Sequence, residues 1–218
     1  ERDDIAAIPE DLPLPFGPFG RMGAAARAQA GTRLPPQQNL ILSNCTIWTC
    51  NEKDEVIENG AVVLSGGKIT YAGPSASMPR LAGEYQTLDL RGMHVTPGLI
   101  DAHSHTGISK GVNEGGQAVT AEVRIGDVTD PDSISWYRQL AGGVTSVNSM
   151  HGSANPIGGQ TQTNKIRWGV SNPNEMHFEG AKPGIKFALG ENVKQSNWGD
   201  GFKTRYPQSR MGVETLIR

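Results

Sequence analysis

The sequence has no long apolar run, few aromatic side chains and no excess of charge of either sign. Of its 218 residues 6% are aromatic, and 20 Lys and Arg stand against 22 Asp and Glu, which gives a net charge of −2. A membrane-spanning helix needs about 20 apolar residues in a row, and a nucleic-acid-binding face is expected to be basic. We therefore expect neither nucleic acid nor a membrane as partner.

Cysteine is also scarce, with only Cys45 and Cys50 present. They lie five apart in a stretch that reads as one strand, so their side chains are expected on opposite faces and not in a disulfide. Both are predicted to be packing residues. The first residue is Glu1, and no signal-peptide pattern follows it. A soluble chain is expected, and a periplasmic or secreted location stays open if an upstream segment is removed.

The chain is predicted to have three parts. Residues 1–37 are Pro-rich and are expected to form an extended arm. Residues 38–92 contain short β-rich segments with Asn59-Gly60 and Gly66-Gly67 as turn signals, which predict a small antiparallel β domain. Residues 93–218 are predicted to begin an α/β barrel.

The barrel prediction comes from a strand, a helix and a second strand in succession. Residues 94–105 form an apolar strand with polar groups at its far end, a helix is expected at 130–140, and a strand follows at 144–150. This is the βαβ unit of a parallel sheet, where ligand sites gather at the carboxyl ends of strands. Asp130 is the expected N-cap of the helix and Pro131 its first residue.

The later segments supply too few strands for a closed barrel, which needs eight strands and about 250 residues. The predicted fold class is α/β: the first part of a TIM barrel, incomplete in this chain, preceded by a small β-sandwich-type domain. The remaining predicted segments are a Gly- and Asn-rich loop at 151–160, strands at 163–168 and 184–189, and a helix from 210 to 218.

His103 and His105 are the first candidate metal ligands. Because they are two apart on a strand, both imidazoles are expected on one face. Neutral imidazole binds zinc and similar ions, and a catalytic site leaves a position for water. A bare His-x-His pair also fits a structural role. Here, however, it ends an apolar strand after a Pro-Gly turn, with Asp101 on the same face, and this context favours a metal site.

The stretch Val95-Thr-Pro-Gly-Leu-Ile-Asp-Ala-His-Ser-His resembles the signature of the amidohydrolase superfamily, nearest to its imidazolonepropionase- and prolidase-like members. The resemblance covers residues 39–218 and leaves the Pro-rich arm outside. It implies that the two histidines bind one or two divalent ions, zinc above all. A metal-activated water would then cleave an amide, a cyclic amide or a dipeptide-like C–N bond of a small substrate.

Many members of this family also use a strand lysine, carboxylated by carbon dioxide, as a bridging ligand, and Lys186 is the candidate. It alternates with Ile185 and Phe187, so the apolar side chains face one way and the lysine the other. Carboxylation turns a costly buried ammonium group into an anionic oxygen ligand. An ion pair of Lys186 with a carboxylate is the alternative, and Lys165 and Glu191 are rival candidates.

His151 is the candidate catalytic residue. It ends the second strand as His105 ends the first, where it would hold a substrate carbonyl or stabilise a developing oxyanion. A hydrogen bond that anchors the loop is the alternative. Gly158 and Gly159 are expected in a tight turn, with close approach to a ligand as the alternative. His94, at the beginning of its strand, is expected to be structural.

The resemblance also implies residues that have no position in this chain, namely histidines from the fifth and sixth strands and an aspartate from the eighth. Because a half-barrel exposes strand edges, we expect the complementary C-terminal half as partner, as a second chain or a missing segment, and an oligomer. The alternative is a catalytically inactive amidohydrolase-like domain that serves as an assembly or binding module.

Overall fold

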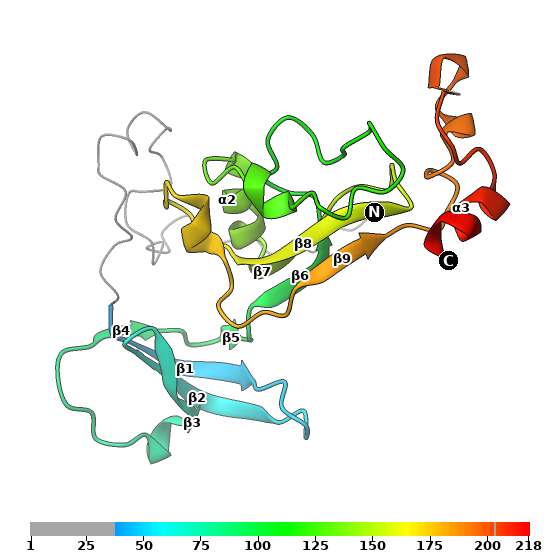
Figure 1. Cartoon of the computed structure of the whole chain (residues 1–218). Coiled ribbons are helices and arrows are strands. Elements are labelled where there is room, and N and C mark those ends of the chain that lie inside the picture. Colours follow the sequence, from blue (N-terminus) through cyan, green and yellow to red (C-terminus); the bar gives the residue numbers. More distant parts are fainter. Residues whose placement is uncertain (1–37, 203) are drawn as a thin grey trace, which may run out of the picture. The chain divides into compact units, whose positions relative to one another are not determined.

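The computed structural model describes residues 38–202 and 204–218 (Figure 1). The arm predicted for residues 1–37 lies outside the described residues. The strands and α-helices are β1 (Leu40–Trp48), β2 (Val56–Ser65), β3 (Lys68–Pro74), β4 (Gln86–Asp89), β5 (His94–Val95), β6 (Leu99–Ser104), α2 (Ile134–Ala141), β7 (Val144–Ser149), β8 (Ile157–Lys165), β9 (Gly184–Phe187) and α3 (Arg210–Ile217). Short 3-10 helices lie at Ser75–Ser77, Ile125–Val128, Pro173–Met176, Gln195–Asn197 and Asp200–Phe202.

Strands β1 to β5 form one sheet in the order β3-β2-β1-β4, with β5 also paired to β1. The β1–β2 and β2–β3 pairs are antiparallel, as predicted. Strands β4 and β5 run parallel to β1, so the prediction of a purely antiparallel sheet is wrong for these two. The reason is the connection after β3, which carries the chain back across the sheet instead of closing a hairpin.

Only one of the two predicted turn pairs makes a turn. Gly66 and Gly67, with φ of 57° and 74°, connect β2 to β3. Asn59 and Gly60 instead lie inside β2, where the register with β1 shifts and Asn59 has a φ of 50°. A β-bulge uses the same conformationally tolerant residues as a turn, so the Asn-Gly signal is shared by both.

The first sheet buries one of the two cysteines. Cys45 packs with Ile47 and Val62 in a hydrophobic cluster, so the packing prediction is confirmed for it. Cys50 is exposed just beyond the end of β1, and the packing prediction is wrong there because the strand stops at Trp48. Both cysteines are free thiols.

The second sheet has the order β6-β7-β8-β9. Strands β6 and β7 are parallel and are connected through α2, which is the predicted βαβ unit. Strand β8 runs antiparallel to β7, and β9 runs antiparallel to β8, so the α/β sheet is mixed rather than wholly parallel. The carboxyl ends of β6, β7 and β9 consequently lie at the same end of the sheet, where β8 begins.

Two predicted boundaries in this region are wrong. The apolar run 94–105 is divided around Pro97 and Gly98 into β5 of the first sheet and β6 of the second. His94 therefore lies in the first sheet, where its Nδ1 accepts a hydrogen bond from Trp48 Nε1 at 2.9 Å. In addition, β8 begins at Ile157, within the predicted loop 151–160. The loop was predicted from glycines that favour a turn, but these glycines lie in the strand.

Helix α2 begins later than predicted. Its N-cap is Ser133, whose Oγ accepts the backbone N–H two residues further on. Asp130 does not cap the helix, because its carboxylate accepts the backbone N–H of Asp132 at 3.0 Å and closes a preceding turn. Pro131 lies in that turn. The helix ends at Gly142, as the Gly-rich stretch predicted.

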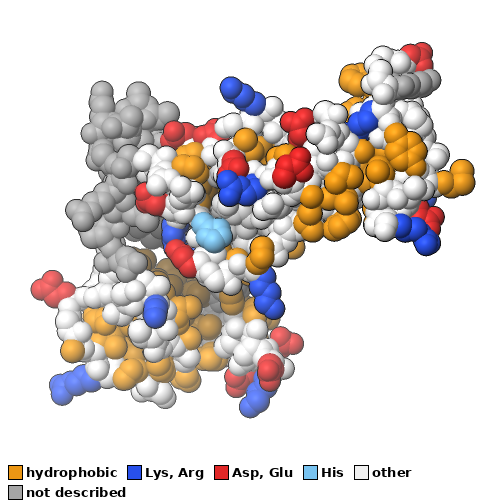
Figure 2. Space-filling view, in the orientation of Figure 1, with side chains coloured by type: hydrophobic (Ala, Val, Ile, Leu, Met, Phe, Trp, Pro, Cys, Tyr) orange, Lys and Arg blue, Asp and Glu red, His pale blue; other side chains and the backbone are white. Residues whose placement is uncertain are grey.

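The second sheet has a buried apolar core, but its two edge strands expose apolar side chains. Helix α2 and strand β7 contribute to one buried cluster, which consists of Trp136, Val147, Ile166, Val170 and Met176. The edge strands leave apolar side chains exposed: Leu99 (59%) and Ile100 (70%) on β6, Ile185 (41%) and Phe187 (47%) on β9. Figure 2 shows hydrophobic side chains gathered over the end of β9 and the chain beyond it. Both edges of this sheet thus present apolar surface.

Among the described residues, no helix has the length and apolar character needed to cross a bilayer.

Candidate metal centre

His103 and His105 lie at the carboxyl end of β6 and face one another. Their ring centroids are 5.0 Å apart and the rings are nearly perpendicular, at 87°. Ser104 between them is buried on the other face, at 3% exposure, which is the alternation expected of a strand. The Asp101 carboxylate accepts the backbone N–H of His103 at 3.0 Å, and its negative charge opposes the lowering of the His103 pKa that Lys186 causes.

The end of β7 fixes the tautomer of His105. The Nδ1 atom of His105 lies 2.8 Å from the Met150 carbonyl oxygen. A carbonyl oxygen can only accept a hydrogen bond, so Nδ1 carries the proton and Nε2 keeps its lone pair. Metal-binding histidines are commonly oriented in this way, by donation of the other ring N–H to a carbonyl or a carboxylate.

Lys186 on β9 extends its side chain to the His103–His105 pair. Its Nζ lies 3.3 Å from His103 Nε2 and 3.5 Å from Met150 Sδ. No carboxylate of the described residues is among these contacts, so the alternative of an ion pair for Lys186 is not realised. The positive charge of Lys186 is the main cause that lowers the pKa of His103, followed by burial and by His105.

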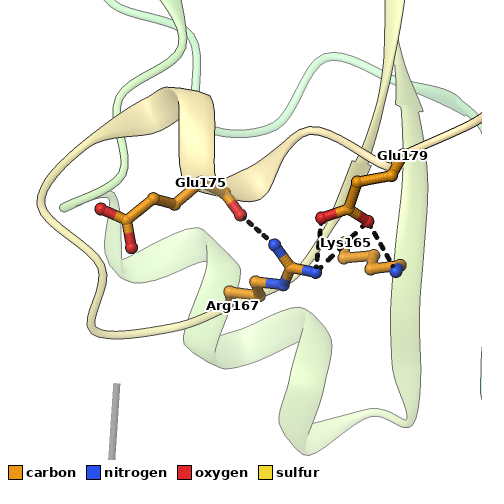
Figure 3. Close-up of polar contacts among 4 residues, drawn as sticks. All are labelled: Lys165, Arg167, Glu175 and Glu179. Atoms are coloured by element: carbon orange, nitrogen blue, oxygen red, sulfur yellow. Dashed lines mark hydrogen bonds and ion pairs between the residues drawn. The ribbon is translucent and has the colours of Figure 1, made fainter. Parts of the chain in front are cut away.

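The rival lysine, Lys165, is used elsewhere. Its Nζ lies 2.8 Å from the Glu179 carboxylate, which Arg167 also contacts at 3.0 Å, and Arg167 further donates to the Glu175 carbonyl (Figure 3). The hydrogen bond from Lys165, with a smaller one from Arg167, lowers the pKa of Glu179 to about 2. Lys165 is therefore part of a surface ion-pair group.

The rival carboxylate, Glu191, is also engaged outside the centre. It pairs with Lys194 at 2.6 Å and with Arg210 at 2.7 Å. The hydrogen bonds from Lys194 and then Arg210 lower the pKa of Glu191 to about 2. Of the three candidates for a further ligand, Lys186 alone contacts the histidine pair.

His151 follows β7 and is enclosed, at 3% exposure. Burial is the main cause that lowers its pKa, with a further contribution from His105, so the imidazole is neutral at pH 7. Its Nδ1 is buried and has no hydrogen-bond partner among the described residues. The alternative of a hydrogen bond that anchors the loop is therefore not seen at this nitrogen.

Two glycines of β8 make room for His151. A Cβ atom at Gly159, where φ is +125°, would come 2.7 Å from His151 Cε1, and one at Gly158 would come 3.1 Å from His151 Cβ and 3.4 Å from Lys186 Cγ. The expected tight turn is wrong, because both glycines lie in β8, where Gly159 pairs with Lys186 and Gly158 lies at an irregularity in the register. Glycine inside a strand signals close approach of another group, and here that group is a candidate site residue.

Met150 is the contributor that sequence reasoning missed. Its carbonyl oxygen meets His105 and its sulfur meets Lys186. A backbone acceptor leaves no signal in residue type, and methionine is most often a core residue, so nothing in the sequence identified it. No group of three or more His, Cys, Asp or Glu side chains in a metal-binding arrangement occurs among the described residues. The candidate set thus consists of two histidines and a lysine.

Known proteins resemble the chain in sequence and in fold. No protein-family model matches the chain. An imidazolonepropionase of Brucella anthropi is 30% identical over 119 residues, which cover 52% of the chain and 26% of that protein. A 5-methylthioadenosine/S-adenosylhomocysteine deaminase of Symbiobacterium thermophilum is 28% identical over 157 residues, 63% of the chain and 36% of that protein.

A solved structure matches over a larger share of the chain than these two relatives. The crystal structure of an amidohydrolase from Thermotoga maritima matches with a TM-score of 0.68 and 32% identity, over 82% of the chain and 45% of that protein. The chain spans between 26% and 36% of the length of the two curated relatives. The resemblance to the amidohydrolase superfamily is thereby confirmed, over a part of the length of these relatives.

Proposed function

We propose that the chain supplies the first ligands of a metal-dependent hydrolase that cleaves an amide, a cyclic amide or a dipeptide-like C–N bond. The observation that carries the proposal is the convergence of His103, His105 and Lys186 from two separate strands, with 5.0 Å between the imidazole rings and 3.3 Å from Lys186 Nζ to His103.

The side chains fit one or two divalent ions, with zinc as the expected metal. The lone pair of His105 Nε2 is left free by the contact of Nδ1 with Met150, as a ligand requires. Lys186 has contacts with an imidazole and a thioether but no carboxylate, so a carbamate formed with carbon dioxide would add an anionic oxygen ligand beside the histidines. A bound ion supplies Lewis acidity for a water molecule and for the scissile carbonyl group.

His151 is proposed to act on the substrate. Because burial keeps the imidazole neutral, it offers one N–H donor and one acceptor rather than a positive charge. Its Nδ1 is enclosed, so we expect Nε2 to face the substrate. A donor fixed at the position where negative charge develops stabilises the transition state more than the ground state.

We further propose that the second sheet is the beginning of a TIM barrel and that the first sheet belongs to the β-sandwich-type domain. The exposed apolar side chains Leu99 and Ile100 on one edge, and Ile185 and Phe187 on the other, support this, because a closed barrel pairs and covers both edges. The complementary half of the barrel, with its further ligands and general base, is the proposed partner, and a small amide or peptide-like molecule the proposed substrate.

Elemental analysis of the intact assembly tests the proposal, with Lys186→Met compared with Lys165→Met. The two substitutions are chemically the same, but Lys165 is paired with Glu179 on the surface. We expect bound metal and activity to be lost in K186M and retained in K165M. After exchange with ¹³C-bicarbonate, wild type and K165M should show a carbamate carbon signal that K186M lacks. Equal metal content in both variants would contradict the proposal.

The alternative function is a catalytically inactive assembly or binding module. The observation that favours it is that no third His, Cys, Asp or Glu joins the histidine pair within the described part of the chain. The same metal analysis separates the two, because a complete, folded barrel that binds no metal would support the module, whereas stoichiometric metal that depends on His103 would support the enzyme.

A further inference from the structure

Arg205 is half-buried, and its guanidinium donates to neutral oxygen atoms of separate chain segments. Nη2 donates to the Ala154 carbonyl at 3.0 Å, and Nη1 donates to Asn155 Oδ1 at 2.7 Å and to the Gln117 carbonyl. With the Gln195 amide turned so that both of its polar groups are satisfied, Nε donates to the Gln195 oxygen at 3.1 Å. A guanidinium has five donors, and most of them are used within the protein.

Asn155 extends these contacts towards β8. It is 2% exposed, and its Nδ2 donates to Thr120 Oγ1 at 2.8 Å and to the Glu114 carbonyl at 2.5 Å. Thr120, at 1% exposure, has its own hydroxyl 3.1 Å from the Gly158 carbonyl oxygen, to which it donates. A continuous series of hydrogen bonds, partly buried at Arg205 and buried from Asn155 onwards, therefore leads from Arg205 to the strand that carries the two glycines.

This series leads to the segments that lie next to His151. Gly152, which follows the histidine, donates its backbone N–H to the Val112 carbonyl at 3.3 Å, so residues 112–120 lie along the segment after β7. In addition, Gly159 packs against the imidazole and Gly158 against the Cβ atom of the same histidine. As a result His151 is enclosed, although the neighbouring His103 and His105 are exposed in the same part of the sheet.

The chemistry of Arg205 suits a structural tie rather than a ligand anchor. Its acceptors are carbonyl and amide oxygens, so the contact depends on direction and not on charge neutralisation. The planar fork of arginine meets several acceptors at fixed angles, which the single ammonium of lysine cannot do. A buried acceptor that loses its donor stays unsatisfied, which makes such a network sensitive to the loss of one member.

We propose that Arg205 is a positioning residue that, through Asn155 and Thr120, fixes the segments around His151 and so holds this imidazole in place. The effect of Arg205 on catalysis rests on the proposed function. Its effect on the enclosure of His151 does not depend on the proposed function and is measured separately.

The experiment compares Arg205→Met with Arg210→Met in the complete protein. Arg210 makes a surface contact with Glu191 and its side chain is 67% exposed, so R210M is the matched control. Histidines are labelled with diethyl pyrocarbonate and the labelled peptides are quantified by mass spectrometry. We expect the labelling rate of His151 to rise about tenfold or more in R205M, and to stay at the wild-type rate in R210M.

A second variant tests the same hydrogen-bond series in case R205M fails to fold. Thr120→Val keeps the shape of the side chain and removes only the hydroxyl between Asn155 and Gly158. We expect T120V to increase the labelling of His151 in the same direction with a normal circular dichroism spectrum. Unchanged labelling of His151 in both R205M and T120V would overturn the inference.

Kinetics then test whether Arg205 acts through His151. A displaced catalytic group lowers kcat, here by on the order of 10–100-fold in R205M, with a smaller change in KM. In a His151→Ala background the R205M substitution should add little, because the group that it positions is gone. Independent, multiplying effects of R205M and H151A would overturn the positioning role.

If the proposed function is wrong, the kinetics give a result that differs from those above. Wild-type activity in H151A would refute a catalytic role for His151, and the labelling rates would then decide on Arg205 alone.

Discussion

Gly159→Ala is the substitution that most directly tests how His151 is held. Gly159 has a φ of +125°, and a Cβ atom there would come 2.5 Å from the Val123 carbonyl oxygen and 2.7 Å from His151 Cε1. Real Cβ atoms essentially never approach other heavy atoms below 3.0 Å. The Val123 oxygen belongs to the backbone, so it cannot turn away as the end of a flexible side chain would.

Two costs add in this variant. An L-residue held at such a φ costs of order 1–3 kcal/mol, and an extra methyl group forced into a packed site costs about 1–3 kcal/mol. Since His151 can relieve part of the overlap by shifting, we expect the free energy of unfolding to fall by about 3 kcal/mol. For a chain of this size this corresponds to a Tm lower by roughly 6–12 °C.

Thermal and denaturant unfolding of the complete protein measure the effect, with Gly190→Ala as control. Gly190 has no positive φ and open space where a Cβ atom would lie, so G190A should stay within about 1 kcal/mol of wild type. If G159A proved as stable as G190A, the close approach of β8 to His151 would be refuted.

Two further predictions concern other parts of the fold. Ser133→Ala removes the cap of α2 and should lower the free energy of unfolding by about 1 kcal/mol in denaturant titrations, whereas an unchanged midpoint would exclude Ser133 as the cap. The pKa of Glu179 is about 2 in the folded protein against an ordinary value of 4.5. Its stabilising contribution is complete above pH 4.5 and disappears as the pH falls towards 2. The stability difference between wild type and Glu179→Gln should therefore shrink across this window, and a difference independent of pH would count against the ion-pair group.

The parts of the fold that follow from local pattern were predictable. The two-residue spacing of His103 and His105 set their common face, and the Gly-rich stretch after α2 marked its end. The end of strand β8 was predicted, within the segment 163–168, but its first part was not, because Gly158 and Gly159 favour a turn unless a distant side chain needs the space. That side chain, His151, becomes visible only once the strands are paired.

The choice among the candidate ligands also needed tertiary structure. Lys165 and Lys186 both lie on strands, and residue type alone does not separate them. Their partners do, since Lys165 meets Glu179 and Lys186 meets His103. The cap of α2 shows the same limit at short range, because Asp130 and Ser133 are both good capping residues and the hydrogen bond decides between them. Metal binding and the catalytic role of His151 remain predictions.

The carbonyl group that orients His105 has a consequence for how this centre changes in evolution. Because the acceptor belongs to the main chain at Met150, no replacement of that side chain removes it. As far as His105 is concerned, the side chain can therefore vary while the imidazole keeps its proton on the same nitrogen, and only the contact of the Met150 sulfur with Lys186 depends on residue type. Alanine at Met150 would leave this contact in place, whereas an insertion or deletion that slides β7 against β6 would abolish it.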